Sequence, residues 1–455
     1  MLAIADAPML IAILYYMAIG HAQLDGDSPC YLQWCPKRTS VYPVFLNLVE
    51  GPWLLPVQLG LLAGSLTWLA WYSFRLFGSL LLCAVLTFGI MANPYVWQLQ
   101  GSVMSEALTT PLLIVLLGCT TGFLVRGSPT TLLAASFAAG VMAAARPGVL
   151  PILIIPLAAL WLANRTAGQK LKLSALCVLV WVAPIAADRA YTRAVLGDRM
   201  TSLAGRHIFA KAALIDAPPL DRSGMGAVDR RLANLLERDL QPVREVLRPL
   251  HGNVRQIVRL NYEVCLQYAC GERLTGDLHL PRAELDDALV RVGTARLERN
   301  PGAYLSLAWD NYRGLWQLHP RKHPDLAREY NAFLKTSAPL PFQPLLGEEG
   351  QIVPSDQQRE YYRYDRLVLI AIGVAVPILI LLFLIQIFRR SGEPLGAGSL
   401  AILVGLEAVL VFAALFGVGI PRYVMGMWPA IVTGFALAGY HLLMLLPHPN
   451  RHAAT

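Results

Sequence analysis

The chain has 455 residues, of which 55% are hydrophobic and only 15% are charged. Soluble globular chains carry roughly 25% charged residues, so this composition argues against a soluble protein and predicts a membrane protein. The formal net charge of +8 would suit a nucleic-acid partner. The sequence shows no zinc-binding pattern, RNP pattern or Arg-rich helix, and we therefore expect no nucleic-acid partner.

Apolar segments predict about ten transmembrane helices. A helix needs about 20 apolar residues to cross a bilayer, and the clearest segment runs from Leu367 to Phe388 with a single polar side chain, Gln386. The fifth and sixth segments are short and adjoin at Arg146-Pro147. We interpret them as two helices, because Arg146 would be costly in mid-bilayer and Pro147 would break a helix. The predicted spans are 5–22, 53–73, 77–95, 107–125, 131–145, 148–163, 172–190, 367–388, 398–418 and 423–446.

Lys and Arg in the short loops predict the orientation, because cytoplasmic loops carry an excess of them. With the N-terminus inside, the inner loops hold Arg75, Arg126, Arg165, Lys170, Lys172, Arg389, Arg390 and Arg451. The outer short loops hold Lys37, Arg38, Arg146 and Arg422. We therefore expect both termini in the cytoplasm.

One long polar segment, 191–366, separates the seventh and eighth spans and is predicted to be an extracytoplasmic soluble domain. Much of it has helical patterning, with leucines three and four residues apart in "MGAVDRRLANLLERDLQPVREVLRPL". "PRAELDDALVRVGTARLER" begins with Pro and acids and ends with Arg, as helices do. The predicted division is a transmembrane module of about seven spans (1–190), the soluble domain (191–366) and a module of about three spans (367–455). The predicted fold class is an all-α polytopic membrane protein.

Seven cysteines fall into two groups. Cys83, Cys119 and Cys177 lie in apolar runs and are expected to be buried small hydrophobes. The others form two C-x4-C pairs in predicted outer loops, where disulfides can form. A bridge within either pair or between the pairs is possible for Cys30, Cys35, Cys265 and Cys270. Pairs so far apart are a weak zinc signal, so we predict no metal site.

Ionisable side chains gather in the predicted outer loops, where such groups are candidates for function. Asp25 and Asp27 lie in the first loop, "HAQLDGDSPCYLQWC", and Glu106 in the second. Arg146 and Arg422 lie in the third and last. Each has a structural interpretation as well. Asp27 can form an Asx turn, Glu106 can favour a helix start, and the arginines can anchor at lipid headgroups.

In order along the chain, these loops resemble one enzyme superfamily. The motifs are "GDSPCYLQ", "YPVFLNLV", "SEALTTPLLIVLL", "AAARPGVLPILIIPL", "RLERNPGAYLSLAWDNYRGLW" and "GIPRYVMGMWPAIV". The sequence resembles the GT-C superfamily of polyprenyl-phosphate-sugar-dependent glycosyltransferases. The branch it looks most similar to contains bacterial protein O-mannosyltransferases and the lipid A aminoarabinose transferase.

The resemblance implies an acidic catalytic base in the first outer loop. Asp27, followed by Ser28 and Tyr31, matches best, and Asp25 is the second choice. It also implies a donor site in a bacterial inner membrane protein. The donor is a polyprenyl-phosphate-linked sugar, and the acceptor is an unidentified glycan, lipid or protein. The residues implied around the donor are Tyr31, Tyr42, Glu106, Arg146, Arg422 and Tyr423.

The residue chemistry fits a single displacement that inverts the anomeric carbon. A carboxylate can take the proton of an attacking hydroxyl, and an arginine can grip the departing phosphate. No phosphate-binding glycine motif for a soluble nucleotide donor is found, and no cofactor is expected. A lipid-linked-sugar transporter or flippase and an O-antigen polymerase or ligase remain alternatives. A transporter would place ionisable groups near mid-membrane, whereas here Glu407 is the main charge inside a predicted span.

Overall fold

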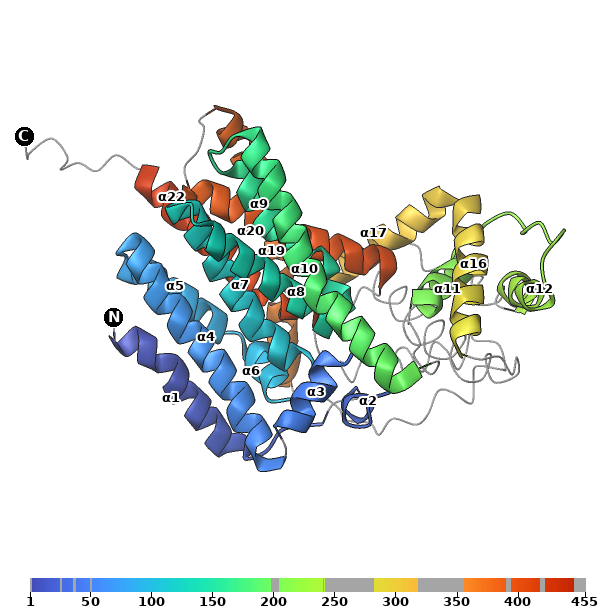
Figure 1. The fold of residues 1–455 in the computed structure, drawn as a ribbon, viewed down its shortest axis with the longest axis horizontal. Helices are drawn as coiled ribbons and strands as arrows, with labels where there is room; N and C mark the ends of the chain where they lie inside the picture. The colour runs from blue at the N-terminus through green and yellow to red at the C-terminus, as the bar shows by residue number, and fades with distance from the viewer. Residues whose placement is uncertain are drawn as a thin grey trace, which may run out of the picture. The chain divides into compact units, whose positions relative to one another are not determined.

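A computed structural model describes residues 2–24, 27–35, 38–49, 51–197, 204–239, 241, 282–317, 356–389, 394–417 and 422–445. Within these ranges every regular element is a helix, and the one β-interaction is an isolated bridge between Gln23 and Ser102. The predicted all-helical class is therefore confirmed for the described part of the chain (Figure 1).

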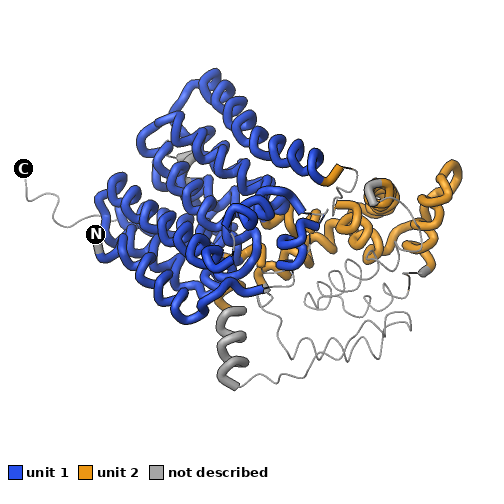
Figure 2. Tube along the Cα trace, turned by 60° about the horizontal axis from the view of Figure 1, so that its bottom comes forward, with its two compact units in different colours: residues 1–195, 375–409, 425–455 blue, residues 196–374, 410–424 orange. Residues whose placement is uncertain are grey.

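The chain divides into two compact units (Figure 2). The first contains residues 1–195, 375–409 and 425–455, and the second contains 196–374 and 410–424. The helices up to the end of α10 are α1 (Leu2–Ile19), α2 (Ser28–Leu32), α3 (Val41–Leu48), η1 (Gly51–Trp53), α4 (Leu54–Phe77), α5 (Leu80–Met91), α6 (Pro94–Gln100), α7 (Glu106–Arg126), α8 (Pro129–Ala145), η2 (Pro147–Leu153), α9 (Ile154–Leu162) and α10 (Ala167–Leu196). The later helices are α11 (Ala204–Leu214), α12 (Ala227–Asn234), η4 (Leu235–Asp239), α16 (Arg282–Arg299), α17 (Pro301–Gln317), α19 (Asp356–Arg389), α20 (Pro394–Phe416), α21 (Arg422–Gly426) and α22 (Trp428–Leu445).

Six helical segments of the described chain are long and apolar enough to cross a membrane: Gly51–Phe77, Glu106–Arg126, Ala167–Leu196, Leu367–Ile385, Pro394–Phe416 and Trp428–Leu445. A seventh span is formed if α5 and α6, which meet at a 63° bend, are one broken crossing. The other predicted spans coincide with shorter apolar helices, Ala3–Ile19, Pro129–Ala145 and Pro147–Leu162. The protein is thus a helical membrane protein by length and composition, and the count of ten spans stays a prediction.

Local chemistry sets the helix ends. Helices α4 and α7 both stop at a glycine in the left-handed conformation, Gly78 (φ 64°) and Gly127 (φ 70°), which residues with a Cβ rarely adopt. Helix α8 stops before Arg146, whose extended backbone (φ −146°, ψ 93°) is the conformation favoured ahead of a proline. The break predicted at Arg146-Pro147 is therefore present.

Small residues let the membrane helices of the first unit approach closely. Helix α7 packs against α4, and a Cβ added to Gly118 or Gly122 would lie within 2.4 Å of Trp68 or 2.2 Å of Tyr72. The rings of Trp68 and Tyr72 stack on one another with their centres 5.1 Å apart. Gly118 and Gly122, a GxxxG pair of α7, pack directly against these stacked rings. Close packing of this kind replaces the hydrophobic effect as the force between helices in lipid.

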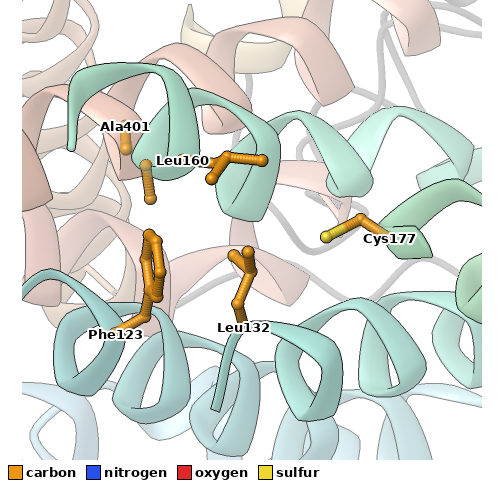
Figure 3. Packing of buried hydrophobic residues seen from close by; sticks show 6 residues of the cluster. Phe123, Leu132, Leu160, Cys177 and Ala401 are labelled. Carbon is orange, nitrogen blue, oxygen red and sulfur yellow. The ribbon is translucent and has the colours of Figure 1, made fainter. Parts of the chain in front are cut away.

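A cluster of buried apolar residues joins five helices of the first unit (Figure 3). Its members are Phe123, Leu132, Ala159, Leu160, Cys177 and Ala401, contributed by α7, α8, α9, α10 and α20.

Cys83, Cys119 and Cys177 are all buried free thiols, as the sequence predicts.

The second unit contains helices of the predicted soluble segment. The two predicted helical stretches correspond to α12 with η4 and to α16, although residues 242–281 and the Pro/Gly-rich stretch at 337–356 lie largely outside the described residues. Helix α16 packs along α11. Buried Arg296 of α16 donates to the carbonyls of Ala212 and Ile215 at the end of α11, at 2.9 and 3.1 Å. A cation is favourable there, because helix C-termini carry unpaired carbonyls and negative partial charge.

Lys211 of α11 is a second buried cation of this unit, with 1% of its surface exposed. Its Nζ donates to the carbonyl oxygen of Ala414, near the end of α20, at 2.8 Å. Burial lowers the pKa of Lys211 to about 7. The pKa of His207, one turn away, is lowered to about 4 by burial and then by the Lys211 charge.

Lys211 gives the protein a pH-dependent stability. Between pH 7 and 10.5 the unfolded state keeps the lysine proton that the folded state has lost, so stability rises with pH across that window. From pH 7 to 9 the gain is on the order of 2 kcal/mol. We expect the melting temperature in detergent to rise over this range in the wild type and to rise less in Lys211→Met. Lys170→Met, which alters a partly exposed lysine outside the second unit, is the control and should behave as the wild type. Equal slopes in all three proteins would contradict the assignment.

Candidate functional site

The first loop, between α1 and α4, is fastened to the segment that precedes α7. The Gln23 N–H donates to the carbonyl of Gly101 at 2.8 Å, and the Val103 N–H donates to the carbonyl of Gln23 at 2.9 Å. The Ser28 hydroxyl donates to the carbonyl of Val103 at 3.0 Å. Two loops that are about 75 residues apart in the chain are thereby held together at one end of the helix bundle.

Asp27, the residue that best matches the expected base, forms an ion pair with Arg38. The distance from Arg38 Nη2 to Asp27 Oδ1 is 2.5 Å. Asp27 occupies the N-cap of α2, but its side chain makes no capping hydrogen bond. The ion pair with Arg38 therefore holds this carboxylate.

Arg38 also contacts Tyr31 in two ways. Its Nη1 donates to the Tyr31 hydroxyl at 3.3 Å, and its guanidinium carbon lies 4.6 Å from the centre of the Tyr31 ring. A guanidinium over a tyrosine face is attracted by the ring quadrupole. Tyr31 therefore holds Arg38 in the orientation in which it meets Asp27.

The hydrogen bonds continue from Tyr31 to a buried ion pair. The Tyr31 and Ser105 hydroxyl oxygens are 3.0 Å apart, and the Ser105 hydroxyl donates to Glu106 Oε2 at 3.3 Å. Arg146 Nη1 lies 2.7 Å from Glu106 Oε1. We call Asp27, Arg38, Tyr31, Ser105, Glu106 and Arg146 the polar network. It joins the first loop, the start of α7 and the break after α8.

The direction of the hydrogen bonds follows from the two charged ends. Arg38 can only donate, so the Tyr31 hydroxyl oxygen accepts from it. Ser105 gives its own proton to Glu106, so its oxygen accepts the proton that Tyr31 donates. Burial is the main cause that raises the pKa of Tyr31, and Glu106 adds to it, although Arg38 acts against the rise. Tyr31 is therefore a protonated donor at neutral pH.

Exposure separates the two carboxylates of the network. The Glu106 side chain has 0% of its surface exposed, whereas that of Asp27 has 37%. A fully buried carboxylate pairs with a cation to offset its desolvation, and Glu106 has that partner in Arg146. Asp27 is thus the more exposed acid of the network, and Glu106 is the acid that positions Arg146.

Tyr42 of α3 supports Tyr31 from behind. It is fully buried, its ring meets the Tyr31 ring edge-on at 5.0 Å, and its hydroxyl accepts from Gln58 at 2.8 Å. Burial raises the pKa of Tyr42 far above its ordinary value. Tyr42 is therefore connected to the polar network through its contact with Tyr31.

Asp188 of α10 holds the start of α3. Its Oδ1 accepts from the Ser40 N–H at 2.7 Å and from the Ser40 hydroxyl at 2.6 Å. It also accepts from the Val41 N–H at 3.2 Å. One carboxylate oxygen thus pairs with N–H groups at the start of α3 that have no acceptor within the helix. This contact fixes the far end of the loop that carries Arg38.

The last loop reaches the network through Gly426. A Cβ added to Gly426, the final residue of α21, would lie 3.5 Å from Arg146 Nη1. Arg422 and Tyr423, at the start of this helix, belong to the second unit, where the Tyr423 hydroxyl lies close to Gly417. Their predicted roles at the donor stay predictions.

The structure bridges Cys30 and Cys35 across α2, with their Cα atoms 4.9 Å apart. Of the pairings that the sequence leaves open, the local bridge within the first C-x4-C motif is therefore the one present. Cys265 and Cys270 lie outside the described residues, and so does Asp25. Among the residues that the structure does describe, no three His, Cys, Asp or Glu side chains come together as a metal site would require.

Two members of the polar network, Arg38 and Ser105, are not identified by the sequence reading. Arg38 serves there only as a charge for the orientation of the helices. Its signal is only a cation in the same loop, 11 residues after the expected base and shortly after the second cysteine of "CYLQWCPKR". Ser105 directly precedes Glu106, but a serine at a helix start is ordinarily interpreted as a cap.

Comparison of the chain with protein-family models, curated proteins and solved structures gave no match.

The buried pair of Glu106 and Arg146 should be strongly coupled. Removing either partner alone leaves a charge uncompensated in a buried site, which costs roughly 3 kcal/mol or more. In a double-mutant cycle of Glu106→Leu and Arg146→Leu, we expect the double variant to lose less stability than the sum of the two single variants, by about 1–3 kcal/mol. Thermal unfolding in detergent provides the measurement.

The exposed pair of Asp229 and Arg291, 3.0 Å apart, is the matched control for that cycle. Its coupling should stay below about 1 kcal/mol, as for surface ion pairs. Additive losses at Glu106 and Arg146 would show that the two side chains do not form a buried pair.

The bridge between Cys30 and Cys35 predicts a defined peptide linkage. Mass spectrometry of the protein digested without reduction should recover a link between these two cysteines. Cys30→Ser/Cys35→Ser should lower stability by about 2 kcal/mol, the chain-entropy value for so short a loop. A recovered link from Cys30 to Cys265 or Cys270 would overturn the local pairing.

Proposed function

We propose that the protein is a membrane glycosyltransferase that moves a sugar from a polyprenyl-phosphate donor to an acceptor hydroxyl. The observation that carries the proposal is the pairing of a partly exposed carboxylate, Asp27, with the guanidinium of Arg38. The polar network adds a second arginine, Arg146, held by Glu106. A base and two cations in one network, at one end of a membrane helix bundle, are what this reaction needs.

The chemistry requires one proton transfer and one departing group. The acceptor hydroxyl attacks the anomeric carbon of the sugar, its proton passes to the base, and the bond to the lipid phosphate breaks as the new glycosidic bond forms. Proton removal by a positioned carboxylate contributes about 10²–10⁴-fold to such rates. The phosphate leaves with added negative charge, and an arginine fork stabilises that charge through paired hydrogen bonds.

The residues divide into these roles as follows. Asp27 is the proposed base, because Glu106 is buried and already paired, and Asp25 remains the alternative. Arg38 orients Asp27 and is the first proposed contact of the departing phosphate, with Tyr31 fixing its plane. Arg146 is the second proposed phosphate contact. Arg422, Tyr423 and Tyr42 keep the donor-side roles that the resemblance implies, Tyr42 acting through Tyr31.

The donor route and the membrane face of the site are also part of what we propose. The donor reaches the network from the membrane, so no soluble nucleotide site is needed. We place the network on the extracytoplasmic face of a bacterial inner membrane, with both termini in the cytoplasm, and we propose no metal cofactor. The acceptor is a hydroxyl of a lipid, glycan or protein.

Substitution of the carboxylates tests the assignment of the base. Protein reconstituted with labelled polyprenyl-phosphate sugar and its membrane acceptors should transfer label, and Asp27→Asn should lower the rate by about 10²-fold or more. Asp25→Asn is the matched control and should stay near the wild-type rate. Both variants are first checked for equal amounts in the membrane. Transfer at the wild-type rate by Asp27→Asn, with a loss in Asp25→Asn, would move the base to Asp25.

The same vesicles distinguish transfer from transport. If labelled sugar crosses the bilayer and never becomes attached to an acceptor, the protein is a flippase and the proposed reaction is wrong. If Arg38→Gln lowers transfer at least as strongly as Arg146→Gln, the phosphate contact lies nearest the first loop. Wild-type transfer by Arg38→Gln would remove Arg38 from the mechanism.

A further inference from the structure

Helix α17 of the second unit has one side that is apolar and only partly covered. Leu305 and Trp309 are each 59% exposed, and the Trp309 ring stacks on that of Tyr312 at 5.5 Å. With Trp316 they recur at steps of three or four residues, so all four lie on one side of the helix. Asp310 and Arg313, which form an ion pair at 3.4 Å, lie on another side. The helix is therefore amphipathic.

The first half of α17 is attached to the end of a membrane helix. The Tyr304 hydroxyl donates to the carbonyl of Leu415 at 2.9 Å. Leu415 is the next-to-last residue of α20, one of the six helical segments of the described chain that are long and apolar enough to cross a membrane. Lys211 of α11 donates to the neighbouring carbonyl of Ala414, so two side chains of the second unit fasten this helix end.

The last turn of α17 is packed against a second membrane helix. Trp316 is 4% exposed, and a Cβ added to Gly373 of α19 would lie 2.7 Å from its ring. The apolar segment of α19 begins at Leu367, six residues before Gly373, which is about 9 Å along a helix. That depth matches the 5–10 Å to which interfacial helices bury their apolar side.

These two attachments set the direction of α17. Tyr304 and Trp316 are twelve residues apart, or about 18 Å along the helix. Their contacts, Leu415 and Gly373, lie about 1.5 Å and about 9 Å inside the ends of their apolar segments, so they differ by about 7.5 Å in depth. The helix axis therefore runs closer to the membrane plane than to its normal. The side that carries Leu305 and Trp309 is also the side on which Trp316 meets α19 inside its apolar segment.

We propose that α17 lies in the membrane interface, with Leu305 and Trp309 embedded in lipid. Tryptophan suits this position, because its ring is apolar and its N–H can reach the headgroups. The paired charges of Asp310 and Arg313, 16% and 34% exposed, lie away from the side that meets the lipid. This surface does not depend on the proposed transferase activity, since it is argued from the second unit alone.

Fluorescence quenching in lipid vesicles tests the proposal. The chain has ten tryptophans, so the signal of Trp309 is taken as the emission that Trp309→Phe loses relative to the wild type. We expect lipids brominated on the upper acyl chain to quench most of this emission, and aqueous iodide to quench little of it. The variant should keep the wild-type melting temperature, because Trp309 is largely exposed.

A tryptophan added on the water side provides the matched control. Arg291 of α16 is 60% exposed, and the emission gained in Arg291→Trp should respond to iodide and not to brominated lipid. If the Trp309 signal responds to iodide in the same way, α17 lies in water and the proposal is wrong. If neither quencher reaches it, a protein segment or a second copy covers this surface, and the proposal is equally wrong.

Discussion

The site depends on the need to compensate one buried charge. Glu106 begins α7 with no exposed surface, and a carboxylate in that state needs a cation within contact distance. Arg146, at the break between α8 and η2, supplies that cation, with its Nη1 2.7 Å from Glu106 Oε1. The pair therefore fixes how the start of α7 meets the end of α8. Because Ser105 donates to the same carboxylate and Tyr31 contacts Ser105, the first loop is held by the same charge. Asp27 and Arg38 are placed at the accessible end of this chain of contacts.

Patterning in the sequence predicts much of the helical architecture, and it does not predict the contacts that build the site. The apolar runs, the break at Arg146-Pro147 and the amphipathic α16 depend on neighbouring residues, and the structure contains all three. Glu106 and Arg146 are both identified as candidates, but their pairing across 40 positions depends on how α7 packs against α8. Arg38 gives no local signal beyond its charge, because its role arises from its contacts with Asp27 and Tyr31.

The second unit shows a similar use of cations. Arg296 and Lys211 are both buried, and each donates to carbonyls at the end of another helix, α11 and α20 respectively. Helix ends offer unpaired acceptors and negative partial charge, so these side chains gain hydrogen bonds that partly offset their desolvation. Together with Tyr304 and Trp316, they fasten α11 and α17 to the ends of helices that can cross a membrane. In the sequence, Arg296 and Lys211 stand out only as charges on amphipathic helices, and nothing local indicates which helix ends they contact.

We propose that the polar network binds the phosphate of a lipid-linked sugar beside Asp27. A cryo-EM structure of the protein in lipid nanodiscs with a polyprenyl-phosphate sugar would show where the phosphate lies. We predict phosphate density within hydrogen-bonding distance of Arg38 or Arg146, with the first sugar carbon facing the Asp27 carboxylate. Phosphate density bound elsewhere in the protein, with the Asp27–Arg38 pair unchanged and distant from it, would show that the polar network is not the donor site.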